Sequence, residues 1–190
     1  MQELKSLCVF CGSRSGSNPA YEKETYALGK LLAQNKIRLI YGGGNLGLMG
    51  AIAKGVSDHH GNITGIIPEF LNKNNEPSNF SNASDEIFIT QNMHERKMLM
   101  FEKADAFVAL PGGIGTLEEM VEQLTWAQLG QHKKPLLLAN FGNFWQPFLD
   151  LLDHMKAQSF TYNDPDIKLL MAATAEGILP KLNEALQSSR

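Results

Sequence analysis

Residues 109–120, ALPGGIGTLEEM, contain the transition that decides the fold. An apolar run ends there in a proline and three glycines, and a segment with the composition of a helix follows at once. A short apolar segment, a glycine-rich turn and a helix form the repeating unit of α/β proteins. The same succession recurs along the chain, so this stretch predicts the architecture of the rest.

The alternation of short apolar segments with longer amphipathic ones predicts seven strands and six helices. The strands are expected at 7–11, 38–41, 63–67, 86–90, 106–110, 136–140 and 167–171, and the helices at 19–34, 47–57, 93–103, 117–129, 144–156 and 175–187. Several strand segments are apolar throughout, as in strands that are covered on both faces. Right-handed crossovers between such strands give an α/β fold, a doubly wound parallel sheet with helices on both faces. Residues 69–84, rich in asparagine, serine and proline, are expected to form a long functional loop.

The composition restricts the class of protein. The chain has 190 residues, which favours a single domain over residues 1–190, and it is 43% hydrophobic and 19% charged, with a net charge of −3. A mildly acidic chain lacks the basic face of a nucleic-acid-binding protein. No apolar run reaches the ~18 residues of a membrane span. The first residues lack the basic segment and cleavage pattern of a signal peptide, so a cytoplasmic protein is expected.

The cysteines and histidines do not indicate a metal or redox site. Cys8 and Cys11 lie on a predicted strand, where side chains three positions apart point to opposite faces. A zinc site would need two further ligands, so the cysteines are interpreted as small buried residues. The five histidines have no metal-binding spacing, and no metal is expected.

Three predicted strands end in glycine-rich turns: FCGSRSGS (10–17), YGGGNLGLMG (41–50) and LPGGIGTLEE (110–119). In open parallel sheets, ligands bind beyond the carboxyl ends of the strands. Glycine lets backbone amides approach a ligand, and a following helix start adds unpaired N–H groups and a positive dipole end. These turns are therefore expected to bind an anion, most often phosphate.

The second turn formally contains G-x-G-x-x-G in Gly42, Gly44 and Gly47. A dinucleotide site should follow the first strand and should have an acid after the next one, where Glu69 is the sole candidate. One interpretation is a tight turn that packs a helix closely on the sheet. The interpretation that we favour is a phosphate or ribose contact to a mononucleotide, with NAD as a lesser alternative. The G-x-x-x-x-G-K-[ST] motif of P-loop NTPases does not occur.

The third turn also has two interpretations. Thr116 and Glu119 have capping-box spacing, with Thr116 as the N-cap, and such a cap stabilises a helix by ~1 kcal/mol. A cap does not require Gly112, Gly113 and Gly115, which lose much backbone entropy on folding. A bound phosphate would explain these glycines and would leave Glu119 beside the ligand, as a candidate for acid–base or cation-stabilising chemistry.

A further helix start, QNMHERKMLM (91–100), carries an unexpected pair of cations. Asn92 and Glu95 have capping-box spacing, which places Arg96 and Lys97 in or next to the first helical turn. Cations there oppose the helix dipole at a cost of a few tenths of a kcal/mol. A solvated helix face would tolerate them, but their position at a strand end beside the glycine turns makes anion binding at least as good an explanation.

Together these motifs resemble one family. VFCGS, YGGGNLGLMG, IPEFL, MHERK, ALPGGIGTLEE and LTWAQLGQHKKP occur in the order and at the intervals of the Lonely Guy family, the cytokinin riboside 5′-monophosphate phosphoribohydrolases, and the resemblance covers roughly residues 5–187. It implies a Rossmann-like fold and a homodimer or a larger assembly of dimers. It also implies hydrolysis of the N-glycosidic bond of a purine nucleoside 5′-monophosphate to the free base and ribose 5-phosphate, without a cofactor.

The resemblance assigns roles to individual residues. Arg96 and Glu119 match the essential arginine and glutamate of the family. The substrate-binding positions would be Gly12, Ser13, Gly43, Gly44, Glu76, Met93, Lys97, Gly112, Gly113, Gly115 and Thr116. In this hypothesis the amides of residues 112–116, with help from the turn around Gly12 and Ser13, hold the 5′-phosphate. Glu119 stabilises the positive charge that departure of the purine leaves on the ribose. The segment between IPEFL and MHERK is longer than usual in the family, and Glu76 is the nearest match to a substrate-contacting glutamate there.

One alternative is rejected and two remain open. Family members have often been labelled lysine decarboxylases, but that reaction normally needs pyridoxal phosphate on a lysine, and no lysine here has a convincing cofactor site. A nucleotide-binding protein without turnover would keep the same motifs. Transfer of the ribosyl group to an acceptor other than water would use the same acid.

Overall fold

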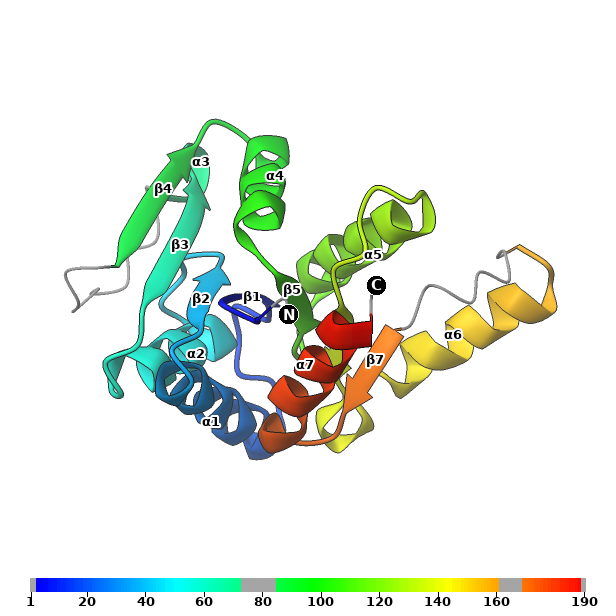
Figure 1. Cartoon of the computed structure of the whole chain (residues 1–190), viewed down its shortest axis with the longest axis horizontal. Helices are drawn as coiled ribbons and strands as arrows, with labels where there is room; N and C mark the ends of the chain where they lie inside the picture. The colour runs from blue at the N-terminus through cyan, green and yellow to red at the C-terminus, as the bar shows by residue number, and fades with distance from the viewer. Residues whose placement is uncertain (1–2, 73–84, 161–168, 189–190) are drawn as a thin grey trace.

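The computed structural model describes residues 3–72, 85–160 and 169–188 (Figure 1). Seven parallel strands form one sheet in the order β4-β3-β2-β1-β5-β6-β7. They are β1 (Ser6–Phe10), β2 (Arg38–Tyr41), β3 (Ile63–Pro68), β4 (Glu86–Thr90), β5 (Ala106–Ala109), β6 (Leu136–Ala139) and β7 (Leu169–Ala172). The doubly wound parallel sheet that the sequence predicts is therefore confirmed.

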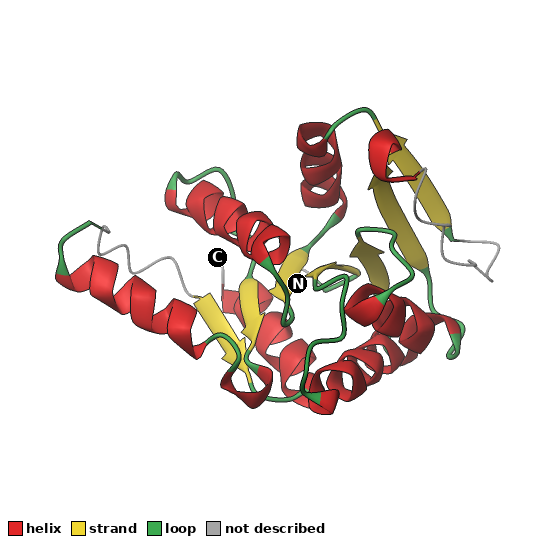
Figure 2. Ribbon diagram, turned by 180° about the vertical axis from the view of Figure 1, so that it is seen from behind, coloured by secondary structure: helices red, strands yellow, loops and turns green. Residues whose placement is uncertain are grey.

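Helices connect the strands and cover both faces of the sheet. They are α1 (Pro19–Gln34), α2 (Gly47–Ser57), α3 (Glu69–Asn72), α4 (Met93–Lys103), α5 (Ile114–Gln128), α6 (Gln146–Ala157) and α7 (Ile178–Ser188), with the tighter turns η1 (Phe141–Asn143) and η2 (Ala175–Gly177). Helices α1, α2 and α7 pack on one face, and α4, α5 and α6 on the other (Figures 1 and 2). No helix in the described part of the chain combines the length and apolar character needed to cross a membrane.

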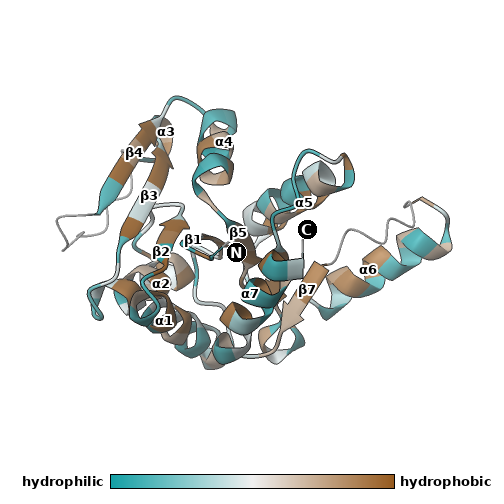
Figure 3. Cartoon of the chain, viewed as in Figure 1, coloured by the Kyte–Doolittle hydropathy of each residue, from teal (hydrophilic) through white to brown (hydrophobic). Residues whose placement is uncertain are grey.

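Each face of the sheet has its own hydrophobic cluster, and Figure 3 shows apolar residues concentrated in the central strands. Successive strand residues alternate between the two clusters, so Leu39 packs under α1 and α2 while Ile40 packs under α4. Cys8 and Cys11 lie in opposite clusters as free, buried thiols. Burial raises the pKa of both thiols, and their buried positions confirm the interpretation as small buried residues.

The direction of winding reverses between β1 and β5. From β1 the chain adds β2, β3 and β4 on one side, and then returns to place β5, β6 and β7 on the other. Hydrogen bonds hold the two central turns together, because Gly12 N–H donates to the Pro111 carbonyl (3.1 Å) and the Gly12 carbonyl accepts from Leu48 N–H (3.1 Å) at the start of α2. Folds of this kind bind ligands at such a reversal, beyond the carboxyl ends of the strands.

The start of α5 differs from the prediction. The helix begins at Ile114 rather than Leu117, with Gly113 as N-cap and no side-chain cap, so the predicted capping box of Thr116 and Glu119 is wrong. Thr116 is helical, and its buried side chain packs over Gly112 instead of capping. Glycine at an N-cap is only slightly less favourable than a capping side chain, so the helix can begin at Ile114 without a side-chain cap at little cost.

Two other segments also differ. Residues 69–72 of the predicted loop form the short helix α3, where Glu69 in the first turn complements the helix dipole. Residues 73–84 of that loop, including Glu76, lie outside the described residues, as does Ile167 of the predicted last strand. Residues 175–177, expected as the first turn of the last helix, form η2.

Candidate active site

A buried ion pair joins α4 to α5. Arg96 Nη1 lies 3.2 Å from Glu119 Oε1, and the two residues are 9% and 8% exposed. Removing both charges from water is costly, so a buried pair of this kind is weak evidence for a stabilising role. Buried titratable groups with a specific charged partner are instead typical of functional sites.

The guanidinium of Arg96 has a fixed place. Arg96 Nε donates to the Ile66 carbonyl (3.1 Å) in β3, and Nη1 donates to Met93 Sδ (3.8 Å) one turn earlier in α4. A Cβ at Gly42 would overlap Nη2 of Arg96 and would lie 3.6 Å from its Cζ. The absence of a side chain at Gly42 therefore makes room for Arg96.

The remaining glycines of the second turn also have reasons within the chain. A Cβ at Gly43, which has a positive φ of 74°, would overlap the side chain of Ile67. A Cβ at Gly44 would lie 2.8 Å from Met49 Cε. The interpretation of this turn as a tight packing device accounts for these glycines, and the substrate contacts of Gly43 and Gly44 stay predictions.

The carboxyl group of Glu119 is easier to protonate than an exposed glutamate. Burial raises the pKa of Glu119 above its usual range, and the positive charge of Arg96 partly opposes that shift. A carboxyl group with a raised pKa suits the exchange of protons with water or a substrate during a reaction.

Lys97 lies in a second set of ion pairs between the same helices. Its Nζ is 2.5 Å from Glu118 Oε1 and 2.9 Å from Glu122 Oε1. Burial alone would lower the pKa of Lys97, but its hydrogen bonds to Glu118 and Glu122 outweigh burial, and the pKa is raised. These pairs tie α4 to α5 beside Arg96 and Glu119, and the substrate-binding role of Lys97 stays a prediction.

Helix α5 starts without a cap, in contrast to α4. The Asn92 side chain accepts the Glu95 N–H at the start of α4 (2.9 Å), as predicted, although the Glu95 carboxylate accepts the N–H of Gln91 (2.7 Å) rather than that of Asn92. At the start of α5, the amides of residues 114–116 have no acceptor among the residues that the structure describes. Unpaired amides at the positive end of a helix dipole are a site for an anion.

Two glycines at this helix start have no packing reason. In the described part of the protein, a Cβ at Gly113 or Gly115 would have no other atom within 4 Å. The adjacent residues and, for Gly115, the backbone of its own helix are left out of this comparison. At Gly112, by contrast, a Cβ would overlap the Thr116 side chain and would lie 2.9 Å from Gly12 N. Gly112 is thus required by packing, whereas Gly113 and Gly115 leave open backbone that a ligand can approach.

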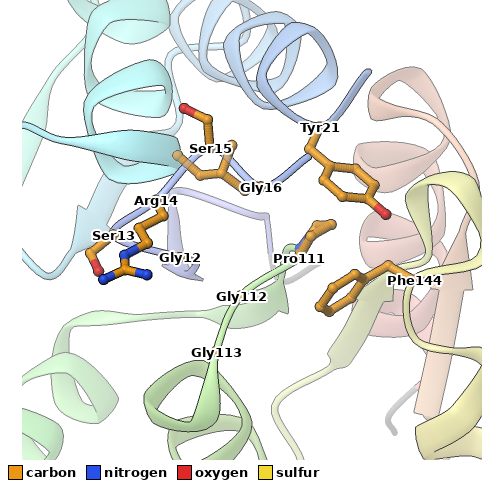
Figure 4. Close-up of a pocket in the computed structure, with 11 residues that line it drawn as sticks. Gly12, Ser13, Arg14, Ser15, Gly16, Tyr21, Pro111, Gly112, Gly113 and Phe144 are labelled. Atoms are coloured by element: carbon orange, nitrogen blue, oxygen red, sulfur yellow. The ribbon is translucent and has the colours of Figure 1, made fainter. Parts of the chain in front are cut away.

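A pocket of about 450 Å³ adjoins this helix start at the winding reversal (Figure 4). Its lining residues are Gly12, Ser13, Arg14, Ser15, Gly16, Tyr21, Leu48, Pro111, Gly112, Gly113 and Phe144. Arg14 was not among the predicted site residues, although it lies in the FCGSRSGS turn. A cation among small residues in that turn was a signal that could have indicated an anion-binding role. Tyr21 and Phe144 come together only through the fold, with ring centroids 5.7 Å apart.

The sheet, its winding reversal and this crevice define a Rossmann-like α/β protein. Within the described residues, no group of three or more His, Cys, Asp and Glu side chains is arranged to hold a metal ion. A family model described as "Possible lysine decarboxylase" matches residues 49–182.

Curated relatives identify the family more closely. The chain is 42% identical over 184 residues to the cytokinin riboside 5′-monophosphate phosphoribohydrolase LOG of Oryza sativa subsp. japonica, covering 95% of this chain and 74% of that protein. It is 37% identical over 175 residues to the cytokinin riboside 5′-monophosphate phosphoribohydrolase of Rhodococcoides fascians, covering 92% of this chain and 87% of that protein. The chain therefore belongs to the Lonely Guy family, as its motifs indicate.

Solved structures share the fold at lower identity. The molybdenum cofactor binding protein of Rippkaea orientalis has a TM-score of 0.69 at 24% identity, covering 98% of this chain and 99% of that one. The molybdenum cofactor carrier protein of Chlamydomonas reinhardtii has a TM-score of 0.70 at 22% identity, covering 97% and 99%. At these identities the likeness concerns the fold alone.

Proposed function

We propose that the protein hydrolyses the N-glycosidic bond of purine nucleoside 5′-monophosphates and releases the free base and ribose 5-phosphate. The observation that carries this proposal is that open amides and a buried acid lie on one helix. Residues 115 and 119 are about 6 Å apart along the axis of α5, which suits the span of a ribose 5-phosphate between its phosphate and its anomeric carbon. The names of the relatives, which specify riboside 5′-monophosphates, support the same substrate class.

In this mechanism the phosphate completes the N-terminus of α5. Each charge-assisted hydrogen bond from the amides of residues 114–116 contributes about 1.5–3 kcal/mol. The sugar then faces Glu119, whose carboxylate stabilises the positive charge that builds on the ribose as the bond to the purine breaks. Water attacks the anomeric carbon and passes a proton to Glu119, while the departing base takes up a proton from solvent on a ring nitrogen. Glu119 then returns its proton to solvent, so the turnover consumes one water and leaves the enzyme unchanged. Arg96 anchors the nucleotide, holds Glu119 in place and donates a hydrogen bond to the leaving base.

Lysine decarboxylation fits these residues poorly. That chemistry requires a lysine that forms a Schiff base with pyridoxal phosphate. Lys97, next to Arg96, is paired with two glutamates, and no lysine lines the pocket beside α5 in the described part of the chain. We therefore derive no step through that cofactor.

We further propose that the protein acts as a homodimer or an assembly of dimers. Met98 on α4, Val121 on α5 and Leu129 at the C-cap of α5 are apolar and 45%, 38% and 67% exposed. A second subunit over these helices would cover apolar surface close to the catalytic pair. Light scattering after size-exclusion chromatography measures the assembly directly, and a monomer at micromolar concentration would contradict this part of the proposal.

The reaction is tested by incubating the purified protein with AMP and with N6-prenylated AMP, and by identifying the products by mass spectrometry. The expected result is free base and ribose 5-phosphate in equal amounts. Binding of AMP without release of adenine would instead support a nucleotide-binding protein. A new nucleotide formed in the presence of an added base would indicate ribosyl transfer.

A further inference from the structure

The pocket at the winding reversal extends beyond the groups that the proposed reaction uses. It meets the start of α5 at Gly112 and Gly113 and continues toward Tyr21 of α1 and Phe144 (Figure 4). Tyr21 packs against the cluster on the α1–α2 face of the sheet, whereas Arg96 and Glu119 come from α4 and α5 on the other face. A monophosphate bound to residues 114–116 with its sugar at Glu119 would contact this pocket only along its edge at Gly12, Ser13, Gly112 and Gly113, and would leave the space between Arg14, Tyr21 and Phe144 empty.

The lining of the pocket has the chemistry of an anion site. Arg14 is the one charged side chain among the lining residues of this pocket in the described chain, and no carboxylate faces it there. The guanidinium of Arg14 and the hydroxyls of Ser13, Ser15 and Tyr21 have no hydrogen-bond or ion-pair partner within residues 3–72, 85–160 and 169–188. All four groups can donate hydrogen bonds, and bonds from a cation to phosphate are the strongest of these.

We propose that this pocket binds the second phosphate of nucleoside 5′-diphosphates, with Arg14 as the residue that recognises it. The inference rests on the proposed function, because it takes the first phosphate to lie on the amides of residues 114–116. Gly113 borders both places, so a phosphate esterified to the first one enters the pocket directly. A volume of about 450 Å³ leaves space for a phosphate with its water shell, and the rings of Tyr21 and Phe144 form the opposite wall (Figure 4).

Competition between nucleotides follows from this arrangement. A nucleoside diphosphate occupies the same first-phosphate site as the monophosphate and adds a charge-assisted contact to Arg14. It therefore displaces the monophosphate, and hydrolysis slows as the ratio of diphosphate to monophosphate rises. The pocket thus makes the reaction responsive to the phosphorylation state of the nucleotide pool.

The test measures binding rather than turnover. AMP and ADP are titrated calorimetrically into the full chain carrying Glu119→Gln, which prevents hydrolysis during the measurement, with and without Arg14→Ser. Arg14→Ser should weaken ADP binding about tenfold or more, the loss of one charge-assisted hydrogen bond, and should change AMP binding less than about threefold. Lys30→Ser is the matched control, because Lys30 is an exposed cation on α1 outside the pocket, and it should change neither affinity.

Several outcomes would overturn the inference. Equal weakening of AMP and ADP binding would place the first phosphate, not the second, at Arg14. Unchanged ADP binding in Arg14→Ser, or no ADP binding at all, would leave the pocket without the assigned ligand. Because these are binding measurements, they stand apart from the proposed function, which fails instead if the wild-type protein releases no base from AMP.

Discussion

Replacing Gly42 with alanine should disable the enzyme without removing any side chain that contacts the substrate in the proposed mechanism. Gly42 directly follows β2 and lies against the guanidinium of Arg96, where a Cβ would overlap Nη2. Arg96 is also held by the Ile66 carbonyl and lies 3.2 Å from Glu119. The added methyl group therefore acts on the geometry of the catalytic pair.

The size of the effect follows from contact distances. Non-bonded carbon atoms prefer separations of about 3.5–4.0 Å, so the guanidinium must move by roughly 1 Å to accept the methyl group. A displacement of that size takes Arg96 out of hydrogen-bond reach of Glu119. A misplacement of about 1 Å at a reacting centre lowers the rate on the order of 100-fold, which corresponds to about 2.7 kcal/mol of the activation barrier.

The assay is steady-state release of adenine from AMP by Gly42→Ala, with the melting temperature measured on the same preparation. We expect kcat to fall on the order of 100-fold while KM changes much less, because the phosphate site on α5 is untouched. Gly177→Ala is the control, since a Cβ there would make ordinary contacts, the nearest at 3.5 Å from Ala172 Cβ. A Gly42→Ala protein that melts like the wild type and keeps its kcat would refute the assigned position of Arg96.

Three further predictions concern the catalytic pair itself. Glu119→Gln should lower kcat by about 10²–10⁴-fold. It should leave the melting temperature unchanged or higher, because burial raises the pKa of the Glu119 carboxyl group and a neutral side chain suits that position. Full activity of this variant would remove Glu119 from the mechanism. Arg96→Ala should abolish turnover. It should also lower the free energy of unfolding by up to about 3–5 kcal/mol at neutral pH, because it leaves Glu119 buried without a partner. Urea unfolding that shows no loss of stability would contradict the buried pair. Because the folded-state pKa of Glu119 lies above its unfolded value, the folded state holds this proton more readily, so its contribution to stability declines as pH rises from the unfolded to the folded pKa. Over the same interval kcat should rise as the carboxylate ionises, and Glu119→Gln, compared by urea unfolding at a series of pH values, should lack this part of the stability profile.

Local signals were enough for most of the fold. Helices α1, α2 and α4 begin and end where the sequence predicts, because caps such as Asn18 and Asn92 and flanking turn residues act within a few positions. The start of α5 was missed for the opposite reason, since the turn before it packs against a distant part of the chain, where Gly12 N–H donates to the Pro111 carbonyl and Gly112 lies close to Gly12. Local chemistry alone favoured the cap.

Some features of the candidate site could be predicted from the sequence, and others depend on contacts that only the folded chain makes. The resemblance to the family was enough to select Arg96 and Glu119, and the structure brings them together. The role of Gly42 was not visible in the sequence, because it depends on the side chain of Arg96 in α4. In the sequence, the strands β3 and β4 lie between Gly42 and α4. The pocket lined by Tyr21 and Phe144 was likewise not predictable, because Tyr21 belongs to α1 and Phe144 lies between β6 and α6, and only the folded chain brings them together.

The way in which Arg96 is held has a consequence for how this protein can diverge from its relatives. Its guanidinium is constrained by β3, α5 and the turn after β2 at once, so almost any substitution around it disturbs the chemistry. The side chain of Arg14, in contrast, belongs to an exposed residue and makes no hydrogen bond or ion pair within the described structure. With the roles proposed above, mutation at residues 13–15 would alter which nucleotides bind while bond cleavage is preserved, and new ligand preferences would arise first at these positions.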